Sequence, residues 1–406
     1  MIEQTPNFAG LNVTINTTED CNMRCKYCYE INKTPRSIDF EKCKKFIDLL
    51  LTDDNYLSFA VDETGSALWK QGFVIDFIGG DALMNVDICD KVLTYLVFKL
   101  NTTNTERAKL WRNSWRCSLS SNGTLFGNQK VRDFLTKWQK NIAIGVSIDG
   151  CPEIHDKNRI MAYRGKNGEE VGSMDIILKD WDWFKKMFPK QAVITKATCS
   201  RETIPYLYES LVFMHETLGL TQINQNFIME DTGCTEEDYK LLREQMQKCI
   251  DYVYEHRNDL FWSMIDKNQF LCLEENRFKD DFYCMGVCGS GCMPALSIDG
   301  DIYPCFRWLP HTQHSKGVMC VGNVEEGFIH SENFKKVRDG AIRANCTKDP
   351  KCKDCEYEFA CKYCIAGCYA EYGDFIRTTH ICEITKIQVE YARKYWARLG
   401  EYPLKK

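Results

Sequence analysis

The sequence predicts an α/β protein in which a parallel β-sheet, closed as a barrel or left open, is followed by a cysteine-rich C-terminal region. Between residues 11 and 229, short apolar runs alternate with longer amphipathic stretches, as in repeated βα units. After residue 230 this alternation gives way to a charged helical pattern and then to a region in which cysteines, glycines and prolines are frequent.

Six apolar runs are candidate strands, and the stretches between them are candidate helices. The strands are expected at residues 11–15, 73–78, 116–120, 142–148, 192–198 and 223–228. The helices are expected at residues 40–51, 86–100, 131–138, 174–188 and 204–218. Polar or glycine residues follow the strands, and in parallel sheets the functional groups gather at the carboxyl ends of the strands. We therefore expect the functional site at that edge.

The chain beyond residue 231 has a different organisation. A charged helical pattern covers residues 236–255, and a final helical pattern covers residues 383–399. We predict four parts: the sheet domain at 1–231, a helical connector at 232–283, a cysteine-rich domain at 284–382 and a C-terminal helix at 383–406.

Charge and cysteine content exclude several classes of function. The 406 residues carry a net charge of −5, from 57 acidic and 52 basic side chains. This balance predicts no nucleic-acid partner and no attraction to anionic membranes. No apolar run is long enough for a membrane span, and the first residues lack the features of a signal peptide, so we expect a cytoplasmic location. In that compartment the 23 cysteines favour metal-bound thiolates over disulfides.

Three cysteines follow the first predicted strand, at Cys21, Cys25 and Cys28. One short loop can place these thiolates around a cubane iron–sulfur cluster and leave the fourth iron open. Ferredoxins normally supply four thiolates, so a set of three implies that another molecule completes the coordination. A zinc site with a distant fourth ligand and a chance grouping are the alternatives that the spacing leaves open. The position at the end of a strand favours a catalytic cluster.

The segment Cys21–Cys28, with Tyr27 before its last cysteine, resembles the CxxxCxΦC signature of radical S-adenosylmethionine enzymes. The resemblance implies a partial (β/α)6 barrel, similar to a TIM barrel, which agrees with the six predicted strands. It also implies a [4Fe-4S] cluster whose open iron binds S-adenosylmethionine. In that family one electron from the cluster cleaves the cofactor to a 5'-deoxyadenosyl radical, which abstracts a hydrogen from the substrate.

Motifs after the later strands extend the resemblance. Gly79-Gly80-Asp81 is similar to the GGE motif that receives the methionine ammonium group, with Asp in place of Glu. Residues 121–123 (Ser-Asn-Gly) are similar to the TNG turn, and residues 147–159 are similar to the SxDGxxxxHDxxR segment, in which we interpret His155 as a packing residue. Residues 200–201 either bind the cofactor carboxylate or form a plain surface loop. The residues implied in cofactor binding are Tyr27, Gly79, Gly80, Asp81, Ser121, Asn122, Ser147, Asp149, Ser200 and Arg201.

The C-terminal cysteines resemble those of the SPASM domain, which holds two auxiliary iron–sulfur clusters in peptide-modifying radical enzymes. Two zinc sites are the alternative interpretation. The resemblance implies one auxiliary [4Fe-4S] cluster on Cys284, Cys288, Cys305 and either Cys364 or Cys368, and another on Cys352, Cys355, Cys361 and Cys382. Cys292 competes with Cys284, which we favour. The chain would then hold three [4Fe-4S] clusters.

The SPASM resemblance implies a peptide or protein substrate. Sulfatase maturases carry an acidic base just after the cysteine that corresponds to Cys305. Here Phe306-Arg307 follows that cysteine, which weakens the interpretation of this chain as a sulfatase maturase. Residues 77–83, 147–156, 306–310 and 364–368 look closer to maturases of precursor peptides with CXXX repeats, which implies cysteine thioether crosslinks of the ranthipeptide or sactipeptide kind. Carbon–carbon crosslinking and epimerisation stay open as alternatives.

Several residues are candidates for holding the peptide. We group Arg307 with the three catalytic cysteines, and add Lys196 and residues 224–226, for which ordinary filling of the barrel is the alternative. The expected partners are a cysteine-rich precursor peptide and a low-potential electron donor such as flavodoxin or ferredoxin. Only 20 residues precede Cys21, so we expect the barrel, residues 236–257 or a separate protein to recognise the leader. A multi-cluster electron carrier is the alternative that is not an enzyme; it explains the C-terminal cysteines but not the barrel.

Overall fold

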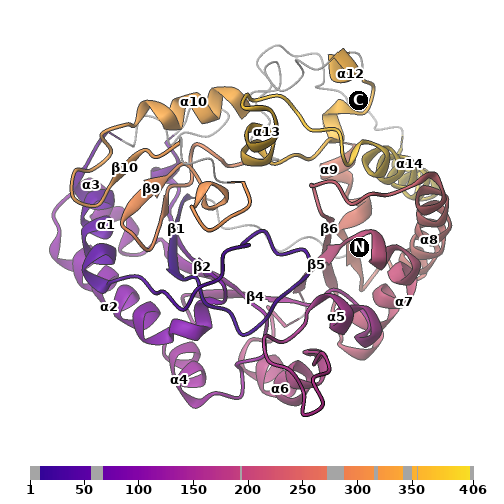
Figure 1. The fold of residues 1–406 in the computed structure, drawn as a ribbon, viewed down its shortest axis with the longest axis horizontal. Helices are drawn as coiled ribbons and strands as arrows, with labels where there is room; N and C mark the ends of the chain where they lie inside the picture. Colours follow the sequence, from indigo (N-terminus) through magenta and orange to yellow (C-terminus); the bar gives the residue numbers. More distant parts are fainter. Residues whose placement is uncertain are drawn as a thin grey trace.

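A parallel sheet wrapped by helices forms the body of the protein (Figure 1). The structure, a computed structural model, describes residues 10–55, 67–192, 194–271, 288–314, 319–341, 350–353 and 355–402. In these residues one ten-stranded sheet has the order β10-β9-β8-β1-β2-β3-β4-β5-β6-β7. Strands β1 to β6 pair as parallel neighbours in chain order, and helices surround them on the outside. The α/β fold with a partial barrel predicted from the sequence is confirmed.

All six predicted strands are present. The strands are β1 (Leu11–Thr18), β2 (Phe73–Gly79), β3 (Trp115–Ser121), β4 (Ile142–Ser147), β5 (Ile194–Cys199), β6 (Gln222–Phe227), β7 (Phe261–Trp262), β8 (Ala295–Leu296), β9 (Asp301–Tyr303) and β10 (Gly322–Asn323). The helices are α1 (Phe40–Thr52), α2 (Val86–Thr102), α3 (Glu106–Trp111), α4 (Gln129–Lys137), α5 (Pro152–Asn158), α6 (Met174–Met187), α7 (Leu207–Val212), α8 (Glu236–Glu255), α9 (Lys267–Phe270), α10 (Glu332–Ala341), α12 (Pro350–Lys353), α13 (Ile365–Tyr372) and α14 (Cys382–Arg398).

The helix expected at residues 204–218 is irregular. The structure divides this segment into a 3-10 turn at Arg201–Tyr206, helix α7 and a π-helical turn at Phe213–Thr217. Pro205 lies inside the first turn, where its missing N–H interrupts the hydrogen-bond ladder of an α-helix.

The two faces of the barrel sheet differ in exposure. Residues such as Val13, Ile75 and Leu119 are buried in one hydrophobic core with the surrounding helices. Alternate positions face the other way, into the barrel, and there Ser120 and Lys196 are exposed and hydrogen-bonded to each other at 2.7 Å. Because a packed barrel would bury both faces, this exposed polar lining indicates an accessible interior.

The cysteine-rich region continues the barrel sheet. Strand β8 pairs in parallel with β1, and β9 and β10 add antiparallel strands at the same edge. The sheet thus crosses the boundary that we placed at residue 231, and the four-part division stays a prediction. None of the helices in the described ranges has the length and apolar character needed to cross a membrane.

Candidate active site

Cys21, the first cysteine of the loop with Cys21, Cys25 and Cys28, lies three residues after β1 ends, at the carboxyl edge of the sheet. The end of β2 packs directly against its start, where Gly80 N–H donates to Thr18 O (3.1 Å) and Asp81 N–H donates to Asp20 O (3.1 Å). A Cβ atom on Gly80 would lie 2.0 Å from the Asp20 carbonyl oxygen, and one on Gly79 would lie 2.0 Å from that of Thr18. Glycine is therefore required at both positions for this close approach.

Asp81 connects the loops after β2 and β3. Its Oδ1 accepts a hydrogen bond from Leu83 N–H (3.0 Å), and its Oδ2 accepts from Asn122 N–H (2.8 Å) and the Ser121 hydroxyl (3.0 Å). The carboxyl group is buried, and burial raises its pKa, an effect that the hydrogen bonds from Asn122 and Leu83 oppose. Three of about four lone-pair directions are occupied, which leaves one for a ligand ammonium.

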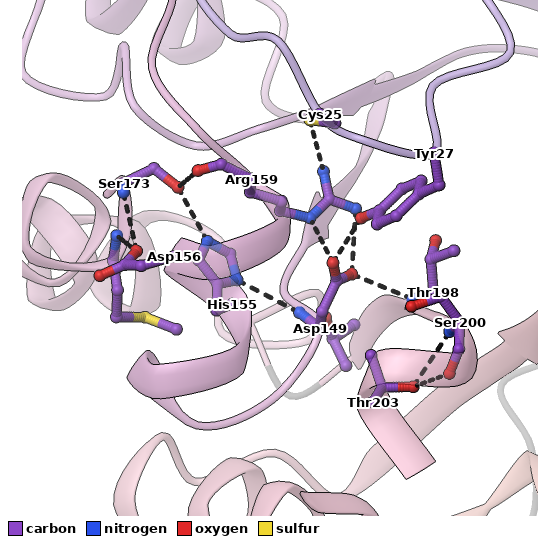
Figure 2. A network of polar contacts seen from close by, with 12 residues as sticks. Cys25, Tyr27, Asp149, His155, Asp156, Arg159, Ser173, Thr198, Ser200 and Thr203 are labelled. Carbon is purple, nitrogen blue, oxygen red and sulfur yellow. Dashed lines mark hydrogen bonds and ion pairs between the residues drawn. The ribbon is translucent and has the colours of Figure 1, made fainter. Parts of the chain in front are cut away.

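A buried ion pair attaches the cysteine loop to the end of β4 (Figure 2). Both carboxylate oxygens of Asp149 contact Arg159, at 3.0 and 3.1 Å, and Thr198 N–H donates to Oδ1 at 3.0 Å. The Tyr27 hydroxyl donates a short hydrogen bond to the same carboxylate, and Arg159 also contacts the Cys25 sulfur at 3.9 Å. Asp149 thus links Tyr27 of the cysteine loop to Arg159. The sequence pattern alone did not indicate this role.

His155 lies behind this ion pair and is fully buried. Its Nδ1 accepts from Asp149 N–H (3.3 Å), so its Nε2 carries the proton and donates to the Ser173 hydroxyl (2.9 Å). Burial lowers the pKa of His155 to about 4, so the ring is neutral at neutral pH. With both nitrogens occupied, His155 is a packing residue as the sequence analysis interpreted it.

The segment after the cysteine loop contacts the C-terminal region. Tyr29 O accepts from Gln313 N–H (2.8 Å), and the Arg307 guanidinium stacks 4.0 Å from the centre of the Tyr29 ring. Glu30, also buried, pairs with Lys33 at 3.2 Å and lies 3.6 Å from His311. The loop is therefore held from two sides, by the barrel and by the cysteine-rich region.

An acidic group that the sequence analysis missed lies beside Arg307. Glu230, three residues after β6, accepts from His314 Nε2 (2.6 Å) and Gln313 Nε2 (3.0 Å) and lies 3.5 Å from Arg307. Burial acts to raise the pKa of Glu230, but the hydrogen bond from His314 and the charge of Arg307 outweigh burial and lower this pKa to about 2. Its position at the carboxyl end of β6 was the signal that could have identified it.

The three thiols suit an iron–sulfur cluster. Cys21 and Cys25 pack with Met23 and Met161 in a small apolar cluster, and burial raises the pKa of Cys21 to about 12 and raises that of Cys25. Such thiols are unreactive by themselves, but coordination by a metal removes the proton. The donor set and its apolar surroundings thus fit the cluster that the sequence implies.

The C-terminal cysteines form two groups. In the first, burial and then the nearby Cys305 and Cys364 raise the pKa of Cys288, and burial and Cys364 raise that of Cys305. The second group comprises Cys352, Cys355, Cys361 and Cys382, in which burial and the neighbouring cysteines raise the pKa of Cys361 and that of Cys382. The two groups contain described cysteines of the two predicted ligand sets and bring Cys364 near Cys305, while Cys368 is buried in the same apolar cluster as Cys305. Cys284 lies outside the described residues, and the ligand roles stay a prediction.

The remaining predicted residues are dispersed. Arg201 pairs with Asp238 of α8 at 2.9 Å, and Ser200 bonds to Glu202 and Thr203 in a capping box, so neither is directed at the cysteine loop by these contacts. Ser147 ends β4 on the inner face of the barrel, at a half-buried position. Of residues 224–226, Gln225 is buried and accepts from Trp262 (2.8 Å), whereas Asn226 is exposed inside the barrel.

Comparisons with known proteins agree with this architecture. No protein-family model matches the chain. An uncharacterised protein of Methanocaldococcus jannaschii is 25% identical over 78% of this chain and 89% of its own length. A cysteine-type anaerobic sulfatase-maturating enzyme of Clostridium novyi is 23% identical over 86% of this chain and 85% of its own length.

Solved structures resemble the whole chain. Native anSMEcpe with bound AdoMet has a TM-score of 0.67 at 17% identity, and the match covers 96% of this chain and 99% of that one. Streptococcus suis SuiB bound to S-adenosylmethionine has a TM-score of 0.55 at 16% identity, covering 92% and 77% of the two chains. SuiB has also been solved with its precursor peptide SuiA, at a TM-score of 0.52. The chain therefore has the fold of these two proteins.

Proposed function

We propose that this chain is a radical S-adenosylmethionine enzyme that modifies a peptide or protein substrate. The observation that carries the proposal is the loop of three cysteines at the end of β1, held against Gly80 and Asp81 and joined to Asp149 through Tyr27. A fold shared with anSMEcpe over nearly the full length of both chains supports it.

We assign different roles to the cysteines, Asp81 and Asp149. Cys21, Cys25 and Cys28 would hold a [4Fe-4S] cluster, which together with bound S-adenosylmethionine supplies a 5'-deoxyadenosyl radical that abstracts a hydrogen. Asp81 has one carboxylate direction left to accept from the ammonium group of the cofactor. Asp149 acts indirectly, because its ion pair fixes the loop that carries the ligands.

The exposed lining of the barrel suits an extended peptide. Ser120, Lys196 and Asn226 offer hydrogen-bond partners inside the barrel, and Lys362 from the cysteine-rich region reaches the same face, donating to Asn226 at 2.6 Å. The peptide would enter between these two regions, next to Arg307.

We propose a cysteine-containing precursor peptide as the substrate and a thioether as the product. Such a crosslink breaks one C–H bond and one S–H bond and forms one C–S bond, so it releases two hydrogens. One would leave with 5'-deoxyadenosine and the other as a proton, and an auxiliary iron–sulfur cluster, if bound, would serve as the acceptor for the remaining electron. The cysteine group that contains Cys305 and Cys364 lies beside Arg307, which is consistent with this electron transfer.

Oxidation of a protein side chain, as a sulfatase-maturating enzyme would perform it, is the second candidate. Phe306-Arg307 replaces the expected acidic residue, but Glu230 places a carboxylate beside Arg307 from another element. Its low pKa leaves it ionised at neutral pH, so it can accept a substrate proton, although as a weak base. The two candidates differ in product, so peptide mass spectrometry separates them.

Iron content and cofactor cleavage test the proposal. After anaerobic reconstitution we expect about twelve irons per chain in the wild type and about eight when Cys21, Cys25 and Cys28 are all replaced by Ala. The triple variant should also form no 5'-deoxyadenosine under strong reduction. Cys234→Ala is the matched control, because this half-buried thiol belongs to neither the loop nor the two C-terminal groups. Undiminished cleavage in the triple variant would refute the proposal, and an electron carrier would show no cleavage even in the wild type.

A further inference from the structure

A second group of potential metal ligands, none of them a cysteine, lies among the helices on the outside of the barrel. His215 belongs to the π-helical turn Phe213–Thr217, and His256 and Asp259 follow α8, which packs against α7 (Figure 1). One nitrogen of each histidine and a carboxylate oxygen of Asp259 all lie within 4.8 Å of one another. A π-helical turn is a rare backbone form that occurs often at functional sites.

Hydrogen bonds fix the tautomer of His215. The Tyr252 hydroxyl donates to Glu216 Oε1 at 3.0 Å, so its oxygen accepts from His215 Nδ1 at 2.8 Å. The proton of the neutral ring is therefore on Nδ1, and Nε2 presents a lone pair. Burial lowers the pKa of His215, which favours this neutral form. Histidines that bind metals typically use their second nitrogen in this way.

The lone pair of His215 faces a carboxylate. Its Nε2 is 3.5 Å from Asp259 Oδ2, and His256 Nδ1 is 4.0 Å from Asp259 Oδ1. These separations are longer than ordinary hydrogen bonds. They approach the distance of about 3.4 Å between two ligand atoms that each lie about 2.1 Å from a tetrahedral zinc ion. A cation among the three atoms would relieve the repulsion between a lone pair and a carboxylate.

The surroundings also favour a cation. His256 is the C-cap of the 20-residue helix α8, where the helix dipole places partial negative charge. The negative charges of Asp259 and of Glu216, the acceptor of the Tyr252 hydroxyl, act on the His215 ring. Asp259 is 60% exposed and His256 is 35% exposed, which leaves a side open for entry and for a water ligand.

We propose that His215, His256 and Asp259 bind one divalent transition-metal ion, with zinc as the ion that two imidazoles and a carboxylate suit best, and that Tyr252 positions His215 for it. The ion would join the π-helical turn to the end of α8. This site is independent of the proposed radical chemistry, because none of its ligands is a thiolate and it lies outside the barrel.

Zinc binding to the cluster-loaded protein tests the proposal. Reconstituted protein is dialysed against zinc chloride of fixed free concentration, and zinc and iron are counted together by mass spectrometry. We expect one zinc per wild-type chain and none at this site in His256→Ala, with equal iron in both. Asp259→Asn, at an exposed position, should also lose the zinc and guards against a folding defect. His330→Ala is the control, since His330 is an exposed histidine near one carboxylate, Glu332, at 3.5 Å.

Tyr252→Phe separates a positioning role from a packing role. It keeps the ring and removes the hydroxyl that orients His215, so zinc affinity should fall by about 10- to 100-fold while the melting temperature without zinc changes little. Zinc should raise the melting temperature of the wild type but not that of His256→Ala. Equal zinc in the wild type and in both ligand variants, or none in the wild type, would overturn the proposal.

Discussion

Replacement of Gly80 by Ala should remove the first iron–sulfur cluster by displacing the loop that holds it. The backbone of Gly80 does not have a positive φ, so Ala adds only the bulk of one methyl group. That Cβ atom would lie 2.0 Å from Asp20 O and 2.7 Å from Cys21 Cβ, whereas Cβ atoms essentially never approach other atoms within 3.0 Å. The Asp20 carbonyl must therefore move by about 1 Å. The obstacle is a backbone atom, which cannot move aside as a flexible side chain could. Since a misplacement of about 1 Å in a catalytic site can cost about 100-fold in rate, we expect the rate of 5'-deoxyadenosine formation to fall by at least that factor.

The assay is iron content and 5'-deoxyadenosine formation after anaerobic reconstitution, with and without S-adenosylmethionine. We expect about four irons fewer than in the wild type. Gly145→Ala is the control, because this glycine of β4 meets only the flexible end of Lys196, at 3.2 Å. Overpacking of this kind costs roughly 1–3 kcal/mol, so the fold should survive, and unchanged far-ultraviolet circular dichroism would verify it. Full iron content with wild-type cleavage in Gly80→Ala would refute the argument that the glycine pair fixes the loop.

Three further predictions follow from the contacts of the site. Arg159→Lys keeps the charge but loses the two-point contact with Asp149 and the contact with Cys25. The rate of 5'-deoxyadenosine formation should therefore fall by about tenfold or more, and an unchanged rate would contradict this prediction. Glu230→Gln should leave cofactor cleavage intact while reducing modified peptide, and equal product yield by mass spectrometry would exclude Glu230 as the proton acceptor. Burial lowers the pKa of His155 from 6.5 to about 4, so between these pH values the unfolded chain binds a proton that the folded chain does not. The free energy of unfolding should therefore fall by up to about 3 kcal/mol as the pH decreases from 6.5 toward 4. Anaerobic urea unfolding should show a smaller loss in His155→Gln, and equal losses would contradict the assignment.

The barrel could be predicted from the sequence because each of its strands buries one face against helices. Leu11, Val13 and Ile15 of β1 all enter the hydrophobic core, and this repeated apolar signal locates the strand. Predicted and observed bounds of the six strands differ by three residues at most. The glycine pair Gly79-Gly80 was noted only for its resemblance to a cofactor-binding motif, and the structure adds that both glycines permit a close backbone approach to the segment before the cysteine loop.

Other features depend on pairings between distant segments and leave little trace in the sequence. Strands β7 to β10 have only two or three residues each, too few for a periodic signal, and β8 joins the sheet through two residue pairs with β1. The Glu230–Arg307 contact joins residues 77 positions apart, so the acidic group near Cys305 was not visible in the residues that follow that cysteine. The use of Asp81 to connect two loops was also unexpected, because the motif suggested only a ligand for the cofactor.

The contacts of the cysteine loop connect the barrel to the cysteine-rich region. On the barrel side, Tyr27 is tied to the Asp149–Arg159 ion pair; on the other side, Tyr29 is stacked on Arg307 and hydrogen-bonded to Gln313. Tyr27 and Tyr29 flank Cys28, so a shift of either region moves a proposed cluster ligand. A peptide bound between the lining of the barrel and Arg307 would touch both supports of the loop. Substrate binding would thereby be coupled to the geometry of the first cluster, which predicts that a bound peptide changes the electron paramagnetic resonance spectrum of the reduced cluster even without contacting it.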